Sequence, residues 1–120
     1  MDLTLLQATE SALVEHWQIA PRGTSPYDLN RQLLLEALSE RILHLLRHRP
    51  EKLLSALYIL DIGELVYNRA MEQDSMEDRA WSLAEAVYDR ETEKIQLREK
   101  YAREYGRGQI GNGDGPDGSG

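Results

Sequence analysis

Leucine and isoleucine recur at helical spacing through the middle of the chain, and this pattern constrains the fold more than any other feature. Leu34, Leu38, Ile42 and Leu45 follow one another at steps of four, four and three residues. That spacing places their side chains on one face of an α-helix. Phenylalanine is absent and valine occurs only at positions 14, 66 and 87, so the chain is poor in residues that favour strands. The sequence therefore predicts an all-α fold.

Prolines, glycines and capping residues divide the remainder of the chain into further helices. We expect helices over about 3–19, 26–48, 50–60, 62–72 and 76–104. Residues 50–72 could also form one kinked helix. The fold class is thus a four- to five-helix bundle or orthogonal array, in which short connections favour antiparallel neighbours.

Three short motifs predict where helices begin. Ser25 precedes a proline, which is typical of an N-cap followed by the first helical residue. Asp61 and Glu64 have capping-box spacing and predict a helix start at 61. Asp74 or Ser75 is expected to cap the last helix.

The apolar stripes also predict which side chains form the core. Trp17, Tyr58, Trp81 and Tyr88 are expected in the core or at its boundary rather than in a ligand cage. The other residues expected to point inward are Leu6, Leu13, Val14, Ile19, Leu33, Leu35, Leu46, Leu53, Leu54, Leu57, Ala80, Leu83, Ala84, Val87, Ile95, Tyr101 and Ala102.

The C-terminal end has a different composition from the body of the chain. Seven of the nine glycines lie among the last fifteen residues, where Ile110 is the only large apolar residue. Such a segment buries too little apolar surface to offset the entropy lost on ordering. We therefore expect a helical domain over 1–105 and a disordered, Gly-rich tail over 106–120.

Composition excludes several classes of function. The formal net charge is −7, which disfavours nucleic acid and anionic membrane surfaces as partners. Cysteine is absent, so disulfides, thiolate metal sites and cysteine nucleophiles are excluded. No basic region precedes an apolar stretch among the first residues, so we expect no signal peptide, and no apolar run is long enough to span a membrane. We expect a cytoplasmic protein.

Two segments resemble a known family. The segment 57–64 reads Leu-Tyr-Ile-Leu-Asp-Ile-Gly-Glu, and 88–95 reads Tyr-Asp-Arg-Glu-Thr-Glu-Lys-Ile, followed by Arg98. Together, over about residues 53–98, they resemble a family of small, uncharacterised, all-helical bacterial proteins. The resemblance implies a helical fold and carries no implied activity.

One helical face offers potential metal ligands. Glu40, His44 and His48 lie four residues apart, and two imidazoles at that spacing can chelate zinc or copper. A solvated face with ordinary pairing between turns explains the same pattern. The spacing signals no further protein ligand, so we expect no metal and no cofactor.

Two basic stretches are candidate docking surfaces. Residues 41–52 are locally basic, which either complements a helix C-terminus or provides a docking patch for an acidic partner or for RNA. Arg90, Lys94 and Arg98 form a ladder on the last helix, interspersed with Glu91, Glu93, Glu99 and Glu104. Such alternation is typical of a solvated face or of a helix that binds a partner.

No nucleophile elbow, phosphate-binding loop or Glu-x-x-His pair occurs in the chain, so we assign no catalytic residue. The leading hypothesis is a protein–protein interaction module of the adaptor type, with self-association as one form. The alternatives are a helical domain that binds a small molecule or metal, and an enzyme without a recognisable motif. An adaptor predicts an exposed apolar patch, whereas the alternatives predict an enclosed pocket.

Overall fold

The computed structural model describes residues 3–20 and 29–106. Within these ranges the chain forms five α-helices and no strand, which confirms the all-α prediction. The predicted tail lies, apart from Gly106, outside the described residues, as does the predicted cap at Ser25.

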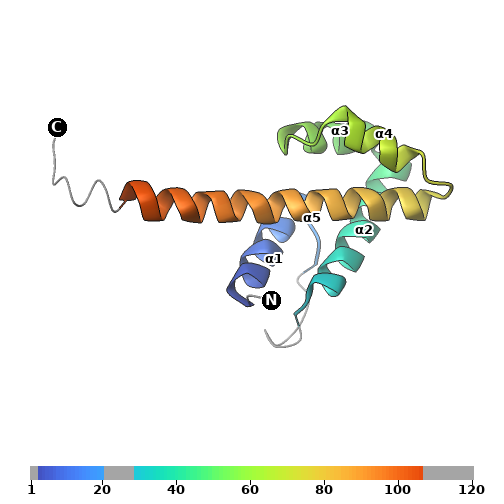
Figure 1. The fold of residues 1–120 in the computed structure, drawn as a ribbon. Coiled ribbons are helices and arrows are strands. Elements are labelled where there is room, and N and C mark those ends of the chain that lie inside the picture. Colours follow the sequence, from blue (N-terminus) through green and yellow to red (C-terminus); the bar gives the residue numbers. More distant parts are fainter. Residues whose placement is uncertain (1–2, 21–28, 107–120) are drawn as a thin grey trace.

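The longest helix, α5 (Met76–Tyr101), is the element around which the others are arranged. It contacts α1 (Leu3–Trp17), α2 (Arg31–His48) and α4 (Glu64–Met71), and α2 also contacts α3 (Pro50–Ile59). A short π-helical turn, η2 (Ala102–Gly106), continues α5. In Figure 1, α1 and α2 lie on one side of α5 and the α3–α4 pair on the other, while the C-terminal part of α5 extends beyond all of them.

The core lies mainly between α2 and α5. The predicted stripe of Leu34, Leu38, Ile42 and Leu45 is buried as expected. It belongs to one cluster with the apolar side chains that α5 buries between Ala80 and Tyr88, and with Leu13 and Trp17 of α1. Burial of each large aliphatic side chain contributes about 1.5–3 kcal/mol, so this seam is the main source of stability.

Three of the four aromatic residues confirm the predicted placement. Trp17 and Tyr88 are buried, and Trp81 is half-buried against the core. The guanidinium of Arg31 lies 5.2 Å from the centroid of the Tyr88 ring and joins the start of α2 to α5. Burial raises the pKa of Tyr88.

The predicted start of the second helix at residue 26 is wrong. Helix α2 begins at Arg31, and the side chain of its N-cap residue, Asn30, accepts a hydrogen bond of 3.0 Å from the Leu33 amide. Leu29 and Leu34, on either side of this cap, are both buried in the core and have the spacing of a hydrophobic staple. The staple and the Asn30 cap together fix the start of the helix.

Residues 50–72 form two helices, α3 and α4, and the predicted capping box at Asp61 is wrong. Asp61 instead follows the C-cap of α3 with a φ of 62°. Its amide donates to the Tyr58 carbonyl and the Ile62 amide donates to the Leu57 carbonyl, each at 3.0 Å. This is a Schellman motif, in which aspartate occupies the position that glycine usually fills.

The predicted cap of the last helix is confirmed at Ser75, whose Oγ accepts a 3.0 Å hydrogen bond from the Asp78 amide. The predicted burial is wrong at four positions. Leu54, Tyr58, Tyr101 and Ala102 are exposed, because no described element covers those faces of α3 and α5. The apolar stripes therefore extend beyond the core onto the surface.

Candidate functional site

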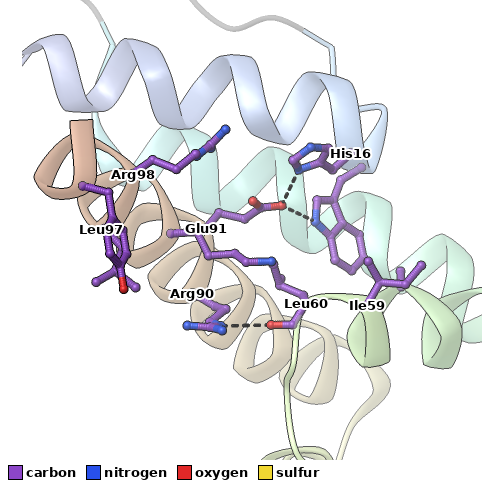
Figure 2. Close-up of a pocket in the computed structure, with 11 residues that line it drawn as sticks. His16, Ile59, Leu60, Arg90, Glu91, Leu97 and Arg98 are labelled. Carbon is purple, nitrogen blue, oxygen red and sulfur yellow. Dashed lines mark hydrogen bonds and ion pairs between the residues drawn. The ribbon is translucent and has the colours of Figure 1, made fainter. Parts of the chain in front are cut away.

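One hollow in the described part of the chain lies between the C-terminal ends of α1 and α3 and the second half of α5. We call it the α5 groove. Its volume is about 660 Å³. His16 and Trp17 of α1 line it, together with Ile59 of α3 and Leu60, which directly follows α3. Arg90, Glu91, Lys94, Leu97, Arg98 and Tyr101 line it from α5 (Figure 2).

The floor of the groove contains a buried carboxylate. Glu91 is 2% exposed. Its Oε2 accepts hydrogen bonds from the Trp17 indole at 3.1 Å and pairs with His16 Nδ1 at 2.9 Å (Figure 2). A buried carboxylate requires such donors to offset its desolvation. Glu91 therefore joins α5 to the end of α1.

The prediction that Glu91 belongs to a solvated face is wrong. Val87 and Ile95 are buried four residues before and four after it, so Glu91 lies within the buried stripe. The sequence signal was this position between two apolar residues at helical spacing. Its partners could not be foreseen, because His16 and Trp17 lie about 75 residues away in the chain.

The wall of the groove at α3 is held by Arg90. Its Nε donates to the Leu60 carbonyl at 3.0 Å, and its other nitrogens contact Glu93 at 2.8 Å and Asp61 at 3.5 Å. The hydrogen bond with Glu93 raises the pKa of Arg90. Arg90 thus satisfies a carbonyl at the end of α3 and fixes that end against α5.

The wall at α1 ends in a strained backbone position. Gln18 has a φ of 57° and terminates the helix directly after Trp17. Arg41 of α2 donates from Nε to the Trp17 carbonyl at 3.0 Å. The turn buries Ile19 in the core and leaves His16 half-exposed beside Glu91.

The upper part of the groove combines apolar and cationic side chains. Ile59 is 76% exposed, Tyr101 59% and Leu97 43%. Lys94 is half-buried and Arg98 is exposed, and neither makes an ion pair with another described residue. The structure thus brings all three members of the predicted ladder to one groove, where Arg90 has an internal role and Lys94 and Arg98 contribute to the lining.

The predicted metal ligands lie elsewhere. Glu40, His44 and His48 are exposed on α2, and the two imidazole rings have centroids 4.9 Å apart. Across residues 3–20 and 29–106, no group of three or more His, Asp or Glu side chains is arranged to hold a metal ion. The geometry gives the metal hypothesis no support.

Three arginines of the basic stretch over 41–52 make contacts with other residues of the same chain. Arg41 binds the end of α1, Arg47 contacts Glu77 at 3.0 Å, and Arg49 contacts Glu51 at 3.2 Å. These pairs support the structural interpretation of the stretch over a docking role.

A second hollow, of about 770 Å³, lies on the α3–α4 pair. Leu54, Tyr58 and Tyr67 contribute to its lining. Tyr58 is 82% exposed, and Leu65 is also exposed on α4. The residues that line this second hollow include no lysine or arginine, unlike the α5 groove with Lys94 and Arg98. The α5 groove therefore offers the more specific chemistry.

Comparison of the chain with protein-family models, with curated proteins and with solved structures finds no match. The geometry defines the protein as an all-α fold that has an open groove, lined by cationic and apolar side chains, beside the longest described helix. No helix in the described ranges has both the length and the apolar character needed to cross a membrane.

Proposed function

We propose that this chain is a protein–protein interaction module of the adaptor type, and that its α5 groove receives an amphipathic helical segment. The observation that carries the proposal is the position of Lys94 and Arg98, which form no ion pair with another described residue, beside the exposed apolar side chains of Ile59, Leu97 and Tyr101. Exposing apolar side chains to water is unfavourable. Covering them with a partner removes this free-energy cost.

The lining of the groove favours a partner with apolar and acidic side chains. A partner helix with apolar side chains at helical spacing could cover Ile59, Leu97 and Tyr101. Such burial stabilises the complex by about 25 cal/mol for each Å² of apolar surface removed from water. Lys94 and Arg98 favour carboxylates beside that apolar stripe. Charges at such a rim contribute to specificity and to the rate of association more than to affinity.

The shape of the groove favours a protein partner over a small molecule. A small-molecule site buries most of the surface of its ligand. Here the upper side chains are 43–76% exposed, so a small ligand would keep much of its surface in water. A helix that lies along α5 would instead cover all three.

The proposal is tested by site-specific photo-crosslinking in cells. A benzophenone amino acid replaces Leu97 in the groove or, as a matched control, Gln32, which is exposed on α2. We expect a cross-linked protein species from position 97 and none from position 32. The product from 97 should decrease when Lys94→Glu and Arg98→Glu are introduced together.

Mass spectrometry of the cross-linked product then identifies its second chain. Absence of any intermolecular product from position 97, or an equal yield of the same products from position 32, would contradict the proposal. A product that persists unchanged with both charge reversals would also contradict it, because the two cations would then have no role in docking.

A further inference from the structure

The α3–α4 pair carries a second apolar surface, beyond the α5 groove. Tyr58 is 82% exposed, Leu65 73% and Leu54 47%. Leu54 and Tyr58 lie one turn apart on α3, and Leu65 lies on α4. The two helices have only 10 and 8 residues. So many large apolar side chains on so short a stretch form a patch, whereas single scattered ones would need no explanation.

This surface contains the second hollow, which lies between the two helices. Contacts between α3 and α4 are sparse, because α3 packs on α2 and α4 packs on α5. The half-buried Ile62 and Tyr67 line the hollow together with Leu54 and Tyr58, and Glu64 is the only charged residue in the lining. We call the apolar residues of this surface the α3–α4 face; they are Leu54, Tyr58, Ile62, Leu65 and Tyr67.

The α3–α4 face has both parts that a two-fold interface requires. Such an interface uses the same patch on both copies, so the patch must be complementary to itself. Tyr58 lines the hollow yet is largely exposed, so its side chain stands at the edge of the hollow rather than inside it. When two copies meet around an axis beside Tyr58, the tyrosine of each copy lies opposite the hollow of the other.

The charge of the face also suits a second copy. The chain has a net charge of −7, so two copies repel each other in general. Close approach is least unfavourable at a surface with few charges, and the lining of this hollow contains only Glu64. Interfaces between identical subunits are more apolar than those between proteins that also exist apart.

The exposed area agrees with a small dimer interface. If a large side chain has about 200 Å² of surface, Leu54, Tyr58 and Leu65 together expose roughly 400 Å². Homodimer interfaces are about 65% apolar, so this area corresponds to roughly 600 Å² on each copy and about 1,200 Å² in total. That total lies at the lower limit for specific, stable interfaces, about 1,200 Å².

We propose that the α3–α4 face is the interface of a homodimer of this chain, in which Tyr58 of each copy packs into the hollow between α3 and α4 of the other. The inference goes beyond the proposed function, because it concerns another surface and another partner. Ile59 lies where the two surfaces meet, since it lines both hollows. An interface of this size is expected to give a reversible dimer.

The first test is sedimentation equilibrium of the full chain at protein concentrations up to about 1 mM. We expect the apparent mass to rise from 13.7 kDa toward twice that value. Tyr58→Glu should weaken dimerisation at least about tenfold, because each copy loses a central aromatic contact and places a charge in the interface. Since Tyr58 is exposed, the variant should unfold at the same urea concentration as the wild type when both are monomeric.

The matched control is Tyr105→Glu, the same substitution at a tyrosine that is 60% exposed in η2. The control should dimerise like the wild type. A chain that stays monomeric at the highest concentration would overturn the inference, as would a Tyr58→Glu variant that dimerises normally. A dimer that Tyr105→Glu weakens as much as Tyr58→Glu would also overturn it.

Gly63 allows a test that leaves Tyr58 in place. Gly63 lines the hollow, and a Cβ added there would meet no atom within 4 Å, so a side chain fits without a clash in the single copy. Gly63→Lys should occupy part of the hollow and weaken dimerisation at least about tenfold. Gly63 is the N-cap of α4, where serine is also favoured, so Gly63→Ser should dimerise like the wild type. Equal dimerisation of the two variants would contradict the inference.

Chemical cross-linking locates the interface. The chain has no cysteine, so Ser55→Cys introduces a single thiol at an exposed residue of the hollow. A short bismaleimide should join two copies of this variant, but not two copies of Ser11→Cys, whose thiol lies on the exposed side of α1. No product from position 55, or equal yields from both positions, would overturn the inference. Photo-cross-linking from position 97 reports separately on the α5 groove, so the dimer and the docking groove can fail independently.

Discussion

The hydrogen-bonded carboxylate of Glu91 leads to a quantitative prediction about stability. Glu91→Ala removes the acceptor of the Trp17 indole N–H, which is buried, and of His16 Nδ1, which belongs to a half-exposed ring. A hydrogen bond to a charged group contributes about 1.5–3 kcal/mol, and an unpaired buried donor costs about 1–3 kcal/mol. Release of the carboxylate from a desolvated position offsets part of this loss. We expect a net loss of about 2–4 kcal/mol in the free energy of unfolding.

The assay is urea unfolding followed by far-UV circular dichroism. Glu99→Ala is the matched control, because Glu99 is exposed on the same helix and forms no ion pair with a described residue. The control should stay within about 0.5 kcal/mol of the wild type. A Glu91→Ala variant that differs from this control by less than about 0.5 kcal/mol would refute the reasoning.

A double-mutant cycle separates the hydrogen bond from the packing of Trp17. Trp17→Phe removes the indole N–H and part of a buried side chain, so it destabilises the fold by itself. If the Trp17–Glu91 bond carries the effect, the cost of Glu91→Ala should be smaller in the Trp17→Phe background, with a coupling of about 1–3 kcal/mol. Additive costs would show that the two side chains act independently.

Three further predictions concern helix ends and are measured by urea unfolding. Asn30→Ala should cost about 1 kcal/mol, because it removes the side-chain acceptor for the Leu33 amide; a cost near zero would contradict the cap. Asp61→Val should destabilise by at least about 1 kcal/mol whereas Asp61→Gly should not, because the φ of 62° suits glycine and excludes branched side chains; equal effects would contradict this. A backbone hydrogen bond, assisted by Arg49, lowers the pKa of Glu51 from its ordinary value of 4.5. The stability that wild type gains over Glu51→Gln should therefore be full above pH 4.5 and disappear as the pH falls through the lowered pKa. A stability difference that grows on acidification would contradict this prediction.

The helical class of the fold could be predicted because local patterns determine it. The stripe from Leu34 to Leu45 specifies a helix by its spacing alone, and it was buried as expected. The start of α2 was misplaced because Ser25 and Asn30 are both good caps, and the burial of Leu29 beside Leu34 decides between them. That burial is a tertiary property that no local pattern contains.

The candidate site was only partly predictable for the same reason. The ladder of Arg90, Lys94 and Arg98 follows from spacing, but its division into one structural arginine and two cations at a groove depends on where α3 ends. Asp61 was expected to start a helix, since its spacing to Glu64 matches a capping box, yet the Schellman geometry places it at the end of one. Tyr58 resembles a core residue in sequence and is exposed because nothing described covers α3 on that side.

Near Ile95, helix α5 and the η2 turn that continues it divide into a packed part and an exposed part that respond differently to substitution. Up to that residue the inner face of α5 is packed into the core, and a change there alters the population of folded molecules. Beyond it, the ten side chains from 96 to 105 face water, and a change there leaves the fold largely untouched. The exposed part can therefore change in sequence with little effect on stability, whereas the packed part is constrained by the core that it helps to form.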